Sequence, residues 1–290
     1  MIDLSEYSKV IFFDTETTGL NPAENKIIEF SAYIENPATG KNETLNVMLR
    51  SETLDHIPDV VQKITHITPE ILEREAINRD QFFKEFARNH LVDSEKVLFV
   101  AHNATFDMMF LHYAFMRAGY ILDYRKYDVI DTLTVFKDRK EYPHKLKDAL
   151  EFYKITDAEN SHRAEDDVKA LVSVFRAMEK EKDDVEHYIN KVGFNPKYMP
   201  DADAVRVLRR VKFYPQPLSP MPIPVWFYIE HKIPATDRIN WKHISEVEKE
   251  LGRQTTSFER MRIQLLIGIY SITEIVGFLK QNNNYAMDYF

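Results

Sequence analysis

The fold is decided by the stretch Val10-Ile11-Phe12-Phe13-Asp14-Thr15-Glu16-Thr17-Thr18-Gly19-Leu20. It begins with apolar, β-branched and aromatic residues, which predict a buried strand that runs into a loop at Thr18-Gly19. Side chains two positions apart point to the same face of a strand, so the carboxylates of Asp14 and Glu16 converge. Two neighbouring anions repel each other unless a cation neutralises them, so the pair indicates a metal site; a solvated turn is the alternative.

Two further strands are predicted next, at residues 27–35 and 44–50, and the turn residues 36–40 between them make an antiparallel hairpin. Helices are then predicted at 59–64, 69–73, 80–90, 105–117, 145–153 and 163–180, with strands at 97–101 and 127–130. Three strands followed by alternating helices and strands predict an α/β fold. We expect a mixed sheet flanked by helices, as in ribonuclease-H-like folds.

The character of the chain changes after about residue 184. Eight of the 13 prolines lie between Pro196 and Pro234, which disfavours long regular elements there. A short helix at 245–251 and a longer one at 257–280, opened by a capping box Thr256-x-x-Glu259, are predicted beyond them. We therefore expect a larger domain at 1–184 and a smaller, mainly helical C-terminal extension at 185–290, with a boundary near 180–195.

The composition is that of a soluble globular protein, with 290 residues, 44% hydrophobic and 29% charged. Cysteine is absent, which excludes disulfides, thiolate zinc sites and cysteine nucleophiles. The start of the sequence has no signal-peptide pattern and no stretch offers about 18 uncharged apolar residues, so we expect a cytoplasmic protein without a membrane partner. The net charge is −8, divided as −11 over residues 1–184 and +3 over 185–290. An acidic first half suits bound divalent cations.

Two further polar motifs follow predicted strands or open predicted helices. The first is His102-Asn103-Ala104-Thr105-Phe106-Asp107, and the second is His162-Arg163-Ala164-Glu165-Asp166-Asp167. Taken alone, Asp107 could complement a helix dipole, Asn103 could cap the helix, and His162 could be a surface residue. Taken with Asp14 and Glu16, the motifs add the carboxylates of Asp107 and Asp167 and the imidazole of His162, in the order strand, helix, helix.

These three motifs resemble the exonuclease motifs of the DEDD superfamily. His162 stands five residues before Asp167, as in the histidine subclass, and Arg163 occupies the position at which the other subclass has tyrosine. Within that subclass, residues 8–180 look closest to proofreading exonucleases of the bacterial polymerase III epsilon type. The segment Lys63-Ile64-Thr65-His66-Ile67-Thr68 is also similar, although His66 is next to Ile67 here, where the family commonly has a glycine between them.

The resemblance implies a catalytic set of Asp14, Glu16, Asp107, His162 and Asp167. The four carboxylates would hold two Mg²⁺ ions, or Mn²⁺, about 3.5–4 Å apart. His162 would take the proton of the attacking water, because histidine exchanges protons near neutral pH. Asp166 is a weaker candidate than Asp167, because only Asp167 keeps the five-residue spacing. Residues implied to bind substrate are Thr17, Thr18, Gly19, Leu20 against the base, Asn103 and Phe106.

The implied activity is 3′→5′ exonuclease cleavage of single-stranded DNA, releasing nucleoside 5′-monophosphates in proofreading or repair. One alternative keeps the chemistry but makes RNA the substrate, as in RNA processing or decay. An alternative of another class is a non-catalytic replication platform whose function resides in residues 185–290. A DNA polymerase or sliding clamp is a possible partner, since residues 286–290 resemble short clamp-binding peptides; an ordinary tail is the alternative.

Overall fold

The structure is a computed structural model of the chain. It describes residues 2–52, 56–92, 94, 96–120, 126–140, 143–156, 164–192, 212–213, 223–224, 241–255, 259–260, 263, 266–267 and 270–280. His162 and its loop, most of the proline-rich stretch, and residues 281–290 lie outside the described residues. Among the described residues, no helix is long and apolar enough to cross a membrane.

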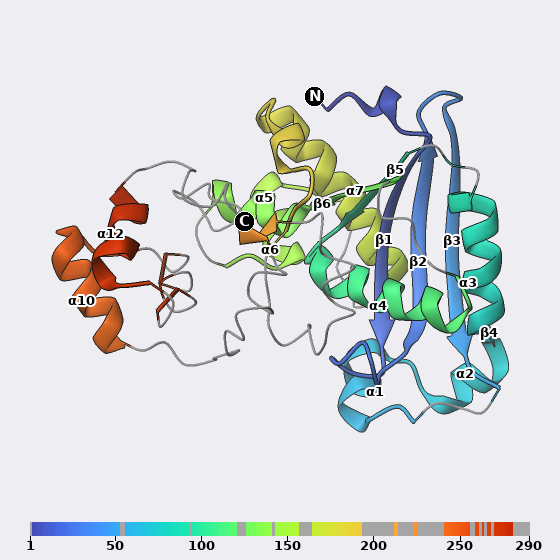
Figure 1. Cartoon of the computed structure of the whole chain (residues 1–290). Coiled ribbons are helices and arrows are strands. Elements are labelled where there is room, and N and C mark those ends of the chain that lie inside the picture. Colours follow the sequence, from blue (N-terminus) through green and yellow to red (C-terminus); the bar gives the residue numbers. More distant parts are fainter. Residues whose placement is uncertain are drawn as a thin grey trace.

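A mixed sheet forms the centre of the catalytic half, which is the part of the chain up to about residue 192, as predicted (Figure 1). The sheet has six strands. Its strands run in the order β4 (Ile77–Asn78), β3 (Lys41–Arg50), β2 (Ile27–Asn36), β1 (Lys9–Thr17), β5 (Val97–Ala101) and β6 (Tyr127–Asp131). The first three strands form an antiparallel meander, and β5 and β6 run parallel to β1. The short strand β4, which pairs with β3, was not predicted.

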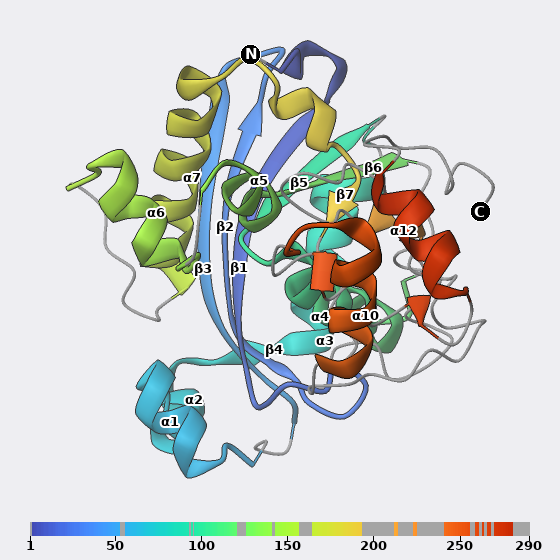
Figure 2. The same cartoon turned by 90° about the vertical axis from the view of Figure 1, so that its left-hand side faces the viewer.

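Helices cover both faces of the sheet because the residues of β1 alternate between two cores. Ile11 and Phe13 pack into a cluster with α3 (Arg79–Ala87) and α4 (Ala104–Arg117). Val10 and Phe12 pack into a second cluster with α5 (Thr132–Arg139), α6 (Leu146–Tyr153) and α7 (Ala164–Glu181). Figure 2 shows the two helix layers on opposite sides of the strands. Two short helices, α1 (Asp59–Thr65) and α2 (Pro69–Glu75), lie beyond the end of β1 in Figure 1.

The predicted helix at 80–90 is two elements. The α-helix α3 ends at Ala87, and a π-helical turn, η2 (Arg88–Val92), follows it. Two short 3₁₀ helices, η1 (Leu4–Glu6) and η4 (Val185–Tyr188), complete the helical elements of the described catalytic half. The helix α5 was missed by the sequence prediction.

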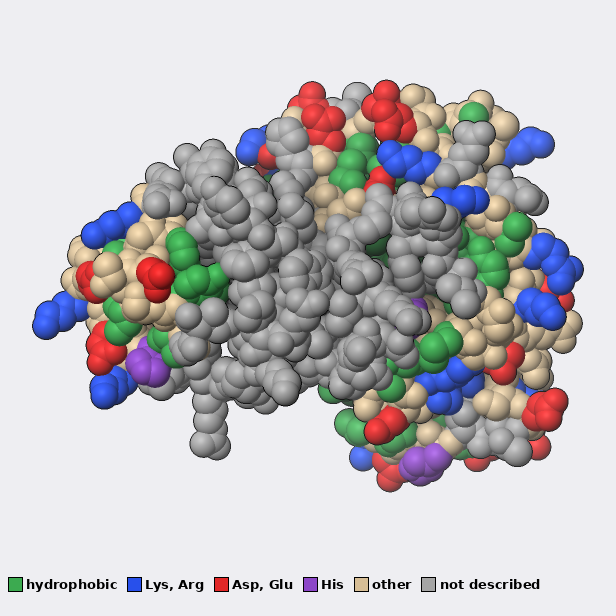
Figure 3. All heavy atoms as spheres, viewed as in Figure 1, with side chains coloured by type: hydrophobic (Ala, Val, Ile, Leu, Met, Phe, Trp, Pro, Cys, Tyr) green, Lys and Arg blue, Asp and Glu red, His purple; other side chains and the backbone are tan. Residues whose placement is uncertain are grey.

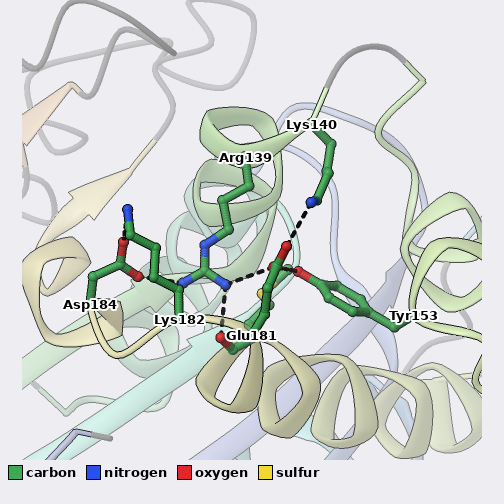
Figure 4. Close-up of polar contacts among 7 residues, drawn as sticks. Arg139, Lys140, Tyr153, Glu181, Lys182 and Asp184 are labelled. Atoms are coloured by element: carbon green, nitrogen blue, oxygen red, sulfur yellow. Dashed lines mark hydrogen bonds and ion pairs between the residues drawn. The ribbon is translucent and has the colours of Figure 1, made fainter.

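A network of ion pairs joins the helices on the α7 face (Figure 4). Arg139 at the end of α5 reaches Glu181 at 3.1 Å and Asp184 at 2.5 Å. Glu181 also accepts hydrogen bonds from Lys140 Nζ at 2.6 Å and from the hydroxyl of Tyr153 on α6 at 2.6 Å. The network therefore holds α5 and α6 to the C-terminal end of α7.

The described part of the C-terminal region contains two helices, α10 (Trp241–Leu251) and α12 (Ile272–Lys280), which pack on each other. It also contains a small sheet of β7 (Lys191–Val192), β8 (Lys212–Phe213) and β9 (Ile223–Pro224).

The prediction of one helix at 257–280 is wrong. Ile267 and Tyr270 form a β-bridge, and a new helix starts after Ser271, whose backbone N–H and hydroxyl donate to Glu274 at 2.8 and 2.7 Å. This Ser-x-x-Glu cap satisfies backbone groups at a helix start within what the sequence pattern presents as one apolar run. Thr256 of the predicted capping box lies outside the described residues, and Glu259 accepts from Arg253 at 2.7 Å.

Candidate active site

Three of the predicted carboxylates meet at the end of β1. Oxygen atoms of Asp14, Glu16 and Asp167 all lie within 4.8 Å of one another. Asp14 and Glu16 point to the α7 face of the strand, and Asp167 reaches them from the first turns of α7. The β1–β2 register shifts between Glu16 and Thr17, and such irregularities commonly re-aim side chains beside active sites. The geometry favours Asp167 over Asp166 as a metal ligand, because Asp166 pairs with Lys169 instead.

Asp107 stands beside these three carboxylates on the first turn of α4, outside the 4.8 Å group. Its Oδ1 accepts a hydrogen bond from Thr15 Oγ1 at 2.7 Å, and its side chain is buried. Asn103 begins α4 in the left-handed conformation, with φ 73°, which asparagine adopts more readily than most residues. The N–H of Asn103 donates to Asp131 Oδ1 at 2.9 Å. The turn that delivers Asp107 is therefore anchored to the end of β6.

His102 anchors the same turn from the other side. Its Nε2 donates to the carbonyl of His144 at 3.1 Å, and its Nδ1 lies 3.0 Å from the Thr132 hydroxyl. Burial lowers the pKa of His102. We assign His102 to the support of the turn.

Among the described residues, the electrostatics of the site are dominated by its carboxylates. Burial raises the pKa of Asp14 well above its ordinary value. Four neighbouring carboxylates raise it further, those of Asp107, Glu16, Asp167 and Glu29. Burial also raises the pKa of Asp107 to about 7, although the hydrogen bond from Thr15 opposes the rise. The site therefore concentrates negative charge in a place where protons or cations must offset it.

A divalent cation fits this donor set. The converging ligands are carboxylate oxygens, which Mg²⁺ and Mn²⁺ prefer over nitrogen or sulfur. Asp14, Glu16 and Asp167 would hold the cation, and its charge would stabilise the ionised form of each carboxylate.

Sequence reasoning missed two buried carboxylates that support the site. Glu29 on β2 lies opposite Glu16 in the strand register, is fully buried, and accepts a hydrogen bond from the N–H of Ala164 at 3.3 Å. Asp131 at the end of β6 accepts from Asn103 and also from the Leu133 N–H and the Thr134 hydroxyl. The available signal was the same in both cases: a carboxylate inside, or directly after, an apolar β-rich run.

The predicted substrate-binding residues lie around this centre. Thr17 and Thr18 are buried, whereas Leu20 is 61% exposed at the tip of the following loop. Asn103 and Phe106 are half-buried at the start of α4, where the Phe106 ring packs against Phe110 with centroids 4.8 Å apart. These residues remain candidates by position.

The segment that departs from the family pattern has a conformational explanation. His66 itself adopts the left-handed conformation at the end of α1, with φ 59° and ψ 18°. That conformation is the one that glycine adopts without strain. The histidine therefore takes the backbone role of a glycine there.

Charges on the outer surface are mixed. On the face drawn in Figure 3, Lys and Arg side chains are spread over the catalytic half with Asp and Glu side chains among them. The described residues of this face thus show no continuous basic stripe of the kind that binds a phosphate backbone.

Comparisons with known proteins identify the family to which this chain is similar. A family model described as exonuclease matches residues 11–175. A 3'-5' exonuclease DinG from Staphylococcus aureus (strain bovine RF122 / ET3-1) is 30% identical over 174 residues, which is 58% of this chain and 18% of that protein. The chain thus spans less than a fifth of the length of this relative.

Solved structures share the fold. Exonuclease I of E. coli in complex with a dA16 oligonucleotide has a TM-score of 0.55 at 19% identity, over 62% of this chain and 42% of that chain. A moderately thermophilic Exonuclease I from Methylocaldum szegediense has a TM-score of 0.53 at 16% identity, over 61% and 41%. The predicted ribonuclease-H-like fold is confirmed. With its motifs, its fold and its match over residues 11–175, the chain belongs to the exonuclease family of the DEDD superfamily.

Proposed function

We propose that this protein is a 3′→5′ exonuclease that hydrolyses the terminal phosphodiester of single-stranded DNA with the help of two divalent cations, Mg²⁺ or Mn²⁺. The observation that carries the proposal is the convergence of Asp14, Glu16 and Asp167 within 4.8 Å, with Asp107 held beside them by Thr15. DNA is favoured over RNA because the matched relatives include Exonuclease I bound to a dA16 oligonucleotide. The likeness of the motifs to epsilon-type proofreading exonucleases supports the same choice.

Each group of site residues has a separate role in the proposed reaction. Asp14, Glu16, Asp107 and Asp167 would hold the cations. When bound, the cations would supply Lewis-acid stabilisation of the charge that develops on the phosphate oxygens. His162 accepts the proton of the attacking water. The water oxygen forms a bond to phosphorus while the bond between phosphorus and the 3′-oxygen breaks. The 3′-oxygen leaves with the shortened strand and takes up a proton to become a hydroxyl, and a nucleoside 5′-monophosphate is released. Thr17, Thr18, Gly19, Leu20, Asn103 and Phe106 bind the terminal nucleotide.

Digestion of 5′-labelled single-stranded DNA and RNA of matched sequence tests the activity. Wild type with Mg²⁺ is expected to give a ladder shortened from the 3′ end, faster on DNA, and no ladder in EDTA. Asp14→Asn should give no ladder. A faster ladder on RNA would replace the substrate in this proposal, and intact DNA and RNA would reject exonuclease activity in favour of the platform function.

The role of His162 has its own test. Replacing it with glutamine should lower kcat by about 10²–10⁴-fold, the usual contribution of a positioned proton acceptor. Binding of Mn²⁺ measured by calorimetry should remain unchanged, because His162 is not proposed as a metal ligand. Unchanged kcat would remove His162 from the mechanism.

A further inference from the structure

The loop at residues 17–26, which follows β1 and carries Leu20, is closed by its own hydrogen bonds. Thr18 N–H donates to the Lys26 carbonyl at 2.9 Å, and Lys26 N–H donates back to the Thr18 hydroxyl at 3.0 Å. Asn21 N–H donates to Asn25 Oδ1 at 2.9 Å, and Asn25 N–H donates to the Asn21 carbonyl at 2.7 Å. Gly19 packs so tightly on Asn25 that a Cβ there would lie 2.7 Å from Oδ1. The loop is therefore a compact unit.

Arg117, the last residue of α4, fastens this unit to the rest of the domain. Its Nη2 donates to the carbonyls of Ala23 at 2.6 Å and Pro22 at 3.1 Å, and its Nη1 donates to the carbonyl of Asn25 at 3.5 Å. The guanidinium also lies 5.5 Å from the centre of the Tyr113 ring. A planar guanidinium can serve several carbonyls at once, whereas a lysine ammonium acts as a single point of charge.

The helix α4 thus joins two parts of the site. Its first turn holds Asp107, which bonds Thr15 on β1, and its last residue holds the loop that follows β1. Leu20 is 61% exposed at the tip of this loop although the loop around it is fixed. An apolar side chain presented to solvent by a loop whose backbone is already fixed can contact a ligand at a low cost in backbone entropy.

We propose that Arg117 is a positioning residue, which holds loop 17–26 so that Leu20 meets the 3′-terminal nucleotide in a fixed place relative to the carboxylates. This inference rests on the proposed function. It assigns Arg117 to binding of the terminal nucleotide and not to the chemical step.

Steady-state kinetics on single-stranded DNA in a double-mutant cycle test it. Arg117→Ala and Leu20→Ala should each raise KM by about tenfold with kcat nearly unchanged, as for the loss of uniform binding. The double variant should raise KM no further than either single variant, because both remove the same contact. Arg117→Lys should recover part of the KM, and Arg88→Ala, at an exposed arginine after α3, should match wild type. An unchanged KM in Arg117→Ala, or additive effects in the double variant, would overturn the proposal.

Hydrogen exchange of the full chain measures how often loop 17–26 opens, and this measurement does not depend on activity. The amides of Thr18, Asn21 and Asn25 should exchange at least about tenfold faster in Arg117→Ala than in wild type, because local opening becomes easier. Amides of β1 and β5 report whether the variant is folded. If Arg117→Ala is not folded, Arg117→Lys is measured in its place. Equal exchange in an active variant would overturn the role of Arg117 alone. Absence of DNA cleavage by wild type would instead overturn the proposed function and, with it, the substrate contact assigned to Leu20.

Discussion

Asp107 shows how a single residue links the site to the stability of the protein. Burial raises its pKa to about 7 in the folded protein, whereas an aspartate in an unfolded chain titrates near about 4. Between those two values the folded state binds the extra proton. The contribution of Asp107 to the free energy of unfolding is therefore fully present below about pH 4 and is lost as the pH rises through about 7.

Substituting Asp107 with asparagine removes this titration. In EDTA, the free energy of unfolding of Asp107→Asn relative to wild type should increase between pH 4.5 and pH 8 by an amount on the order of a few kcal/mol. Urea unfolding at several pH values measures it. Asp166→Asn is the matched control, because it makes the same substitution at an aspartate whose side chain is 44% exposed. A difference for Asp107→Asn that does not change with pH would contradict the assignment.

At the scale of elements, the start of α7 sets the position of the site residues, because this helix directly follows His162 in the sequence and carries Asp167. Glu29 accepts the N–H of Ala164, the first residue of the helix, and thereby ties that helix start to β2. The Glu29 carboxylate also raises the pKa of Asp14 through charge repulsion. The strand β2 therefore helps to set the position of a proposed metal ligand on another element.

Replacing Glu29 should weaken the metal site even though Glu29 is not proposed as a ligand. Glu29→Ala should lower Mn²⁺ affinity by about 10–100-fold, as for other residues that orient ligands. Glu29→Gln should lower it less, because the amide oxygen still accepts the Ala164 N–H. Calorimetric titration with Mn²⁺ measures both. Equal affinities in wild type and Glu29→Ala would show that the Ala164 contact does not orient Asp167.

The elements that the sequence predicted were those with a clear period and clear ends. The apolar, β-rich run Val10–Phe13 predicted the strand β1, and the Asp14-x-Glu16 pair lies at its end. The helix α5 was missed because Thr132, Thr134 and Val135 are β-branched and have weak helix propensity. Its start is set by the side chain of Asp131, which caps the Leu133 N–H at 3.0 Å.

Supporting residues could not be predicted from local patterns. Glu29 and Asp131 act through partners 135 and 28 positions away in the chain, Ala164 and Asn103. In the sequence, Arg117 has the position of an ordinary basic residue at a helix C-terminus. Only the tertiary structure shows that it contacts the loop that carries Leu20. Contacts over such separations depend on the whole fold.

At the scale of the whole molecule, the end of the catalytic unit can be refined. Val185 and Tyr188 are buried in the same core as α7. The N–H of Asn190 donates to the Val129 carbonyl at 2.8 Å, and the Val129 N–H donates to Asn190 Oδ1 at 3.0 Å. We propose that the catalytic unit extends to about residue 192, which lies within the predicted boundary of 180–195.

Two truncations test this boundary. A fragment of residues 1–192 should have a higher Tm than one of residues 1–184, because the shorter fragment loses the three buried apolar side chains of Val185, Tyr188 and Val192, worth about 1.5–3 kcal/mol each. Thermal unfolding followed by circular dichroism compares them. Equal Tm values would place the boundary at 184.

The central claim, that the carboxylates converging at the end of β1 are a catalytic metal site, is tested most directly by two adjacent aspartates. The measurement is the rate of nucleoside monophosphate release from single-stranded DNA with Mg²⁺, for Asp167→Asn and Asp166→Asn side by side. Asp167→Asn should lose nearly all activity and Asp166→Asn should retain it, because only Asp167 lies within 4.8 Å of Asp14 and Glu16 in the described site. Full activity in Asp167→Asn, or equal loss in both variants, would contradict the account.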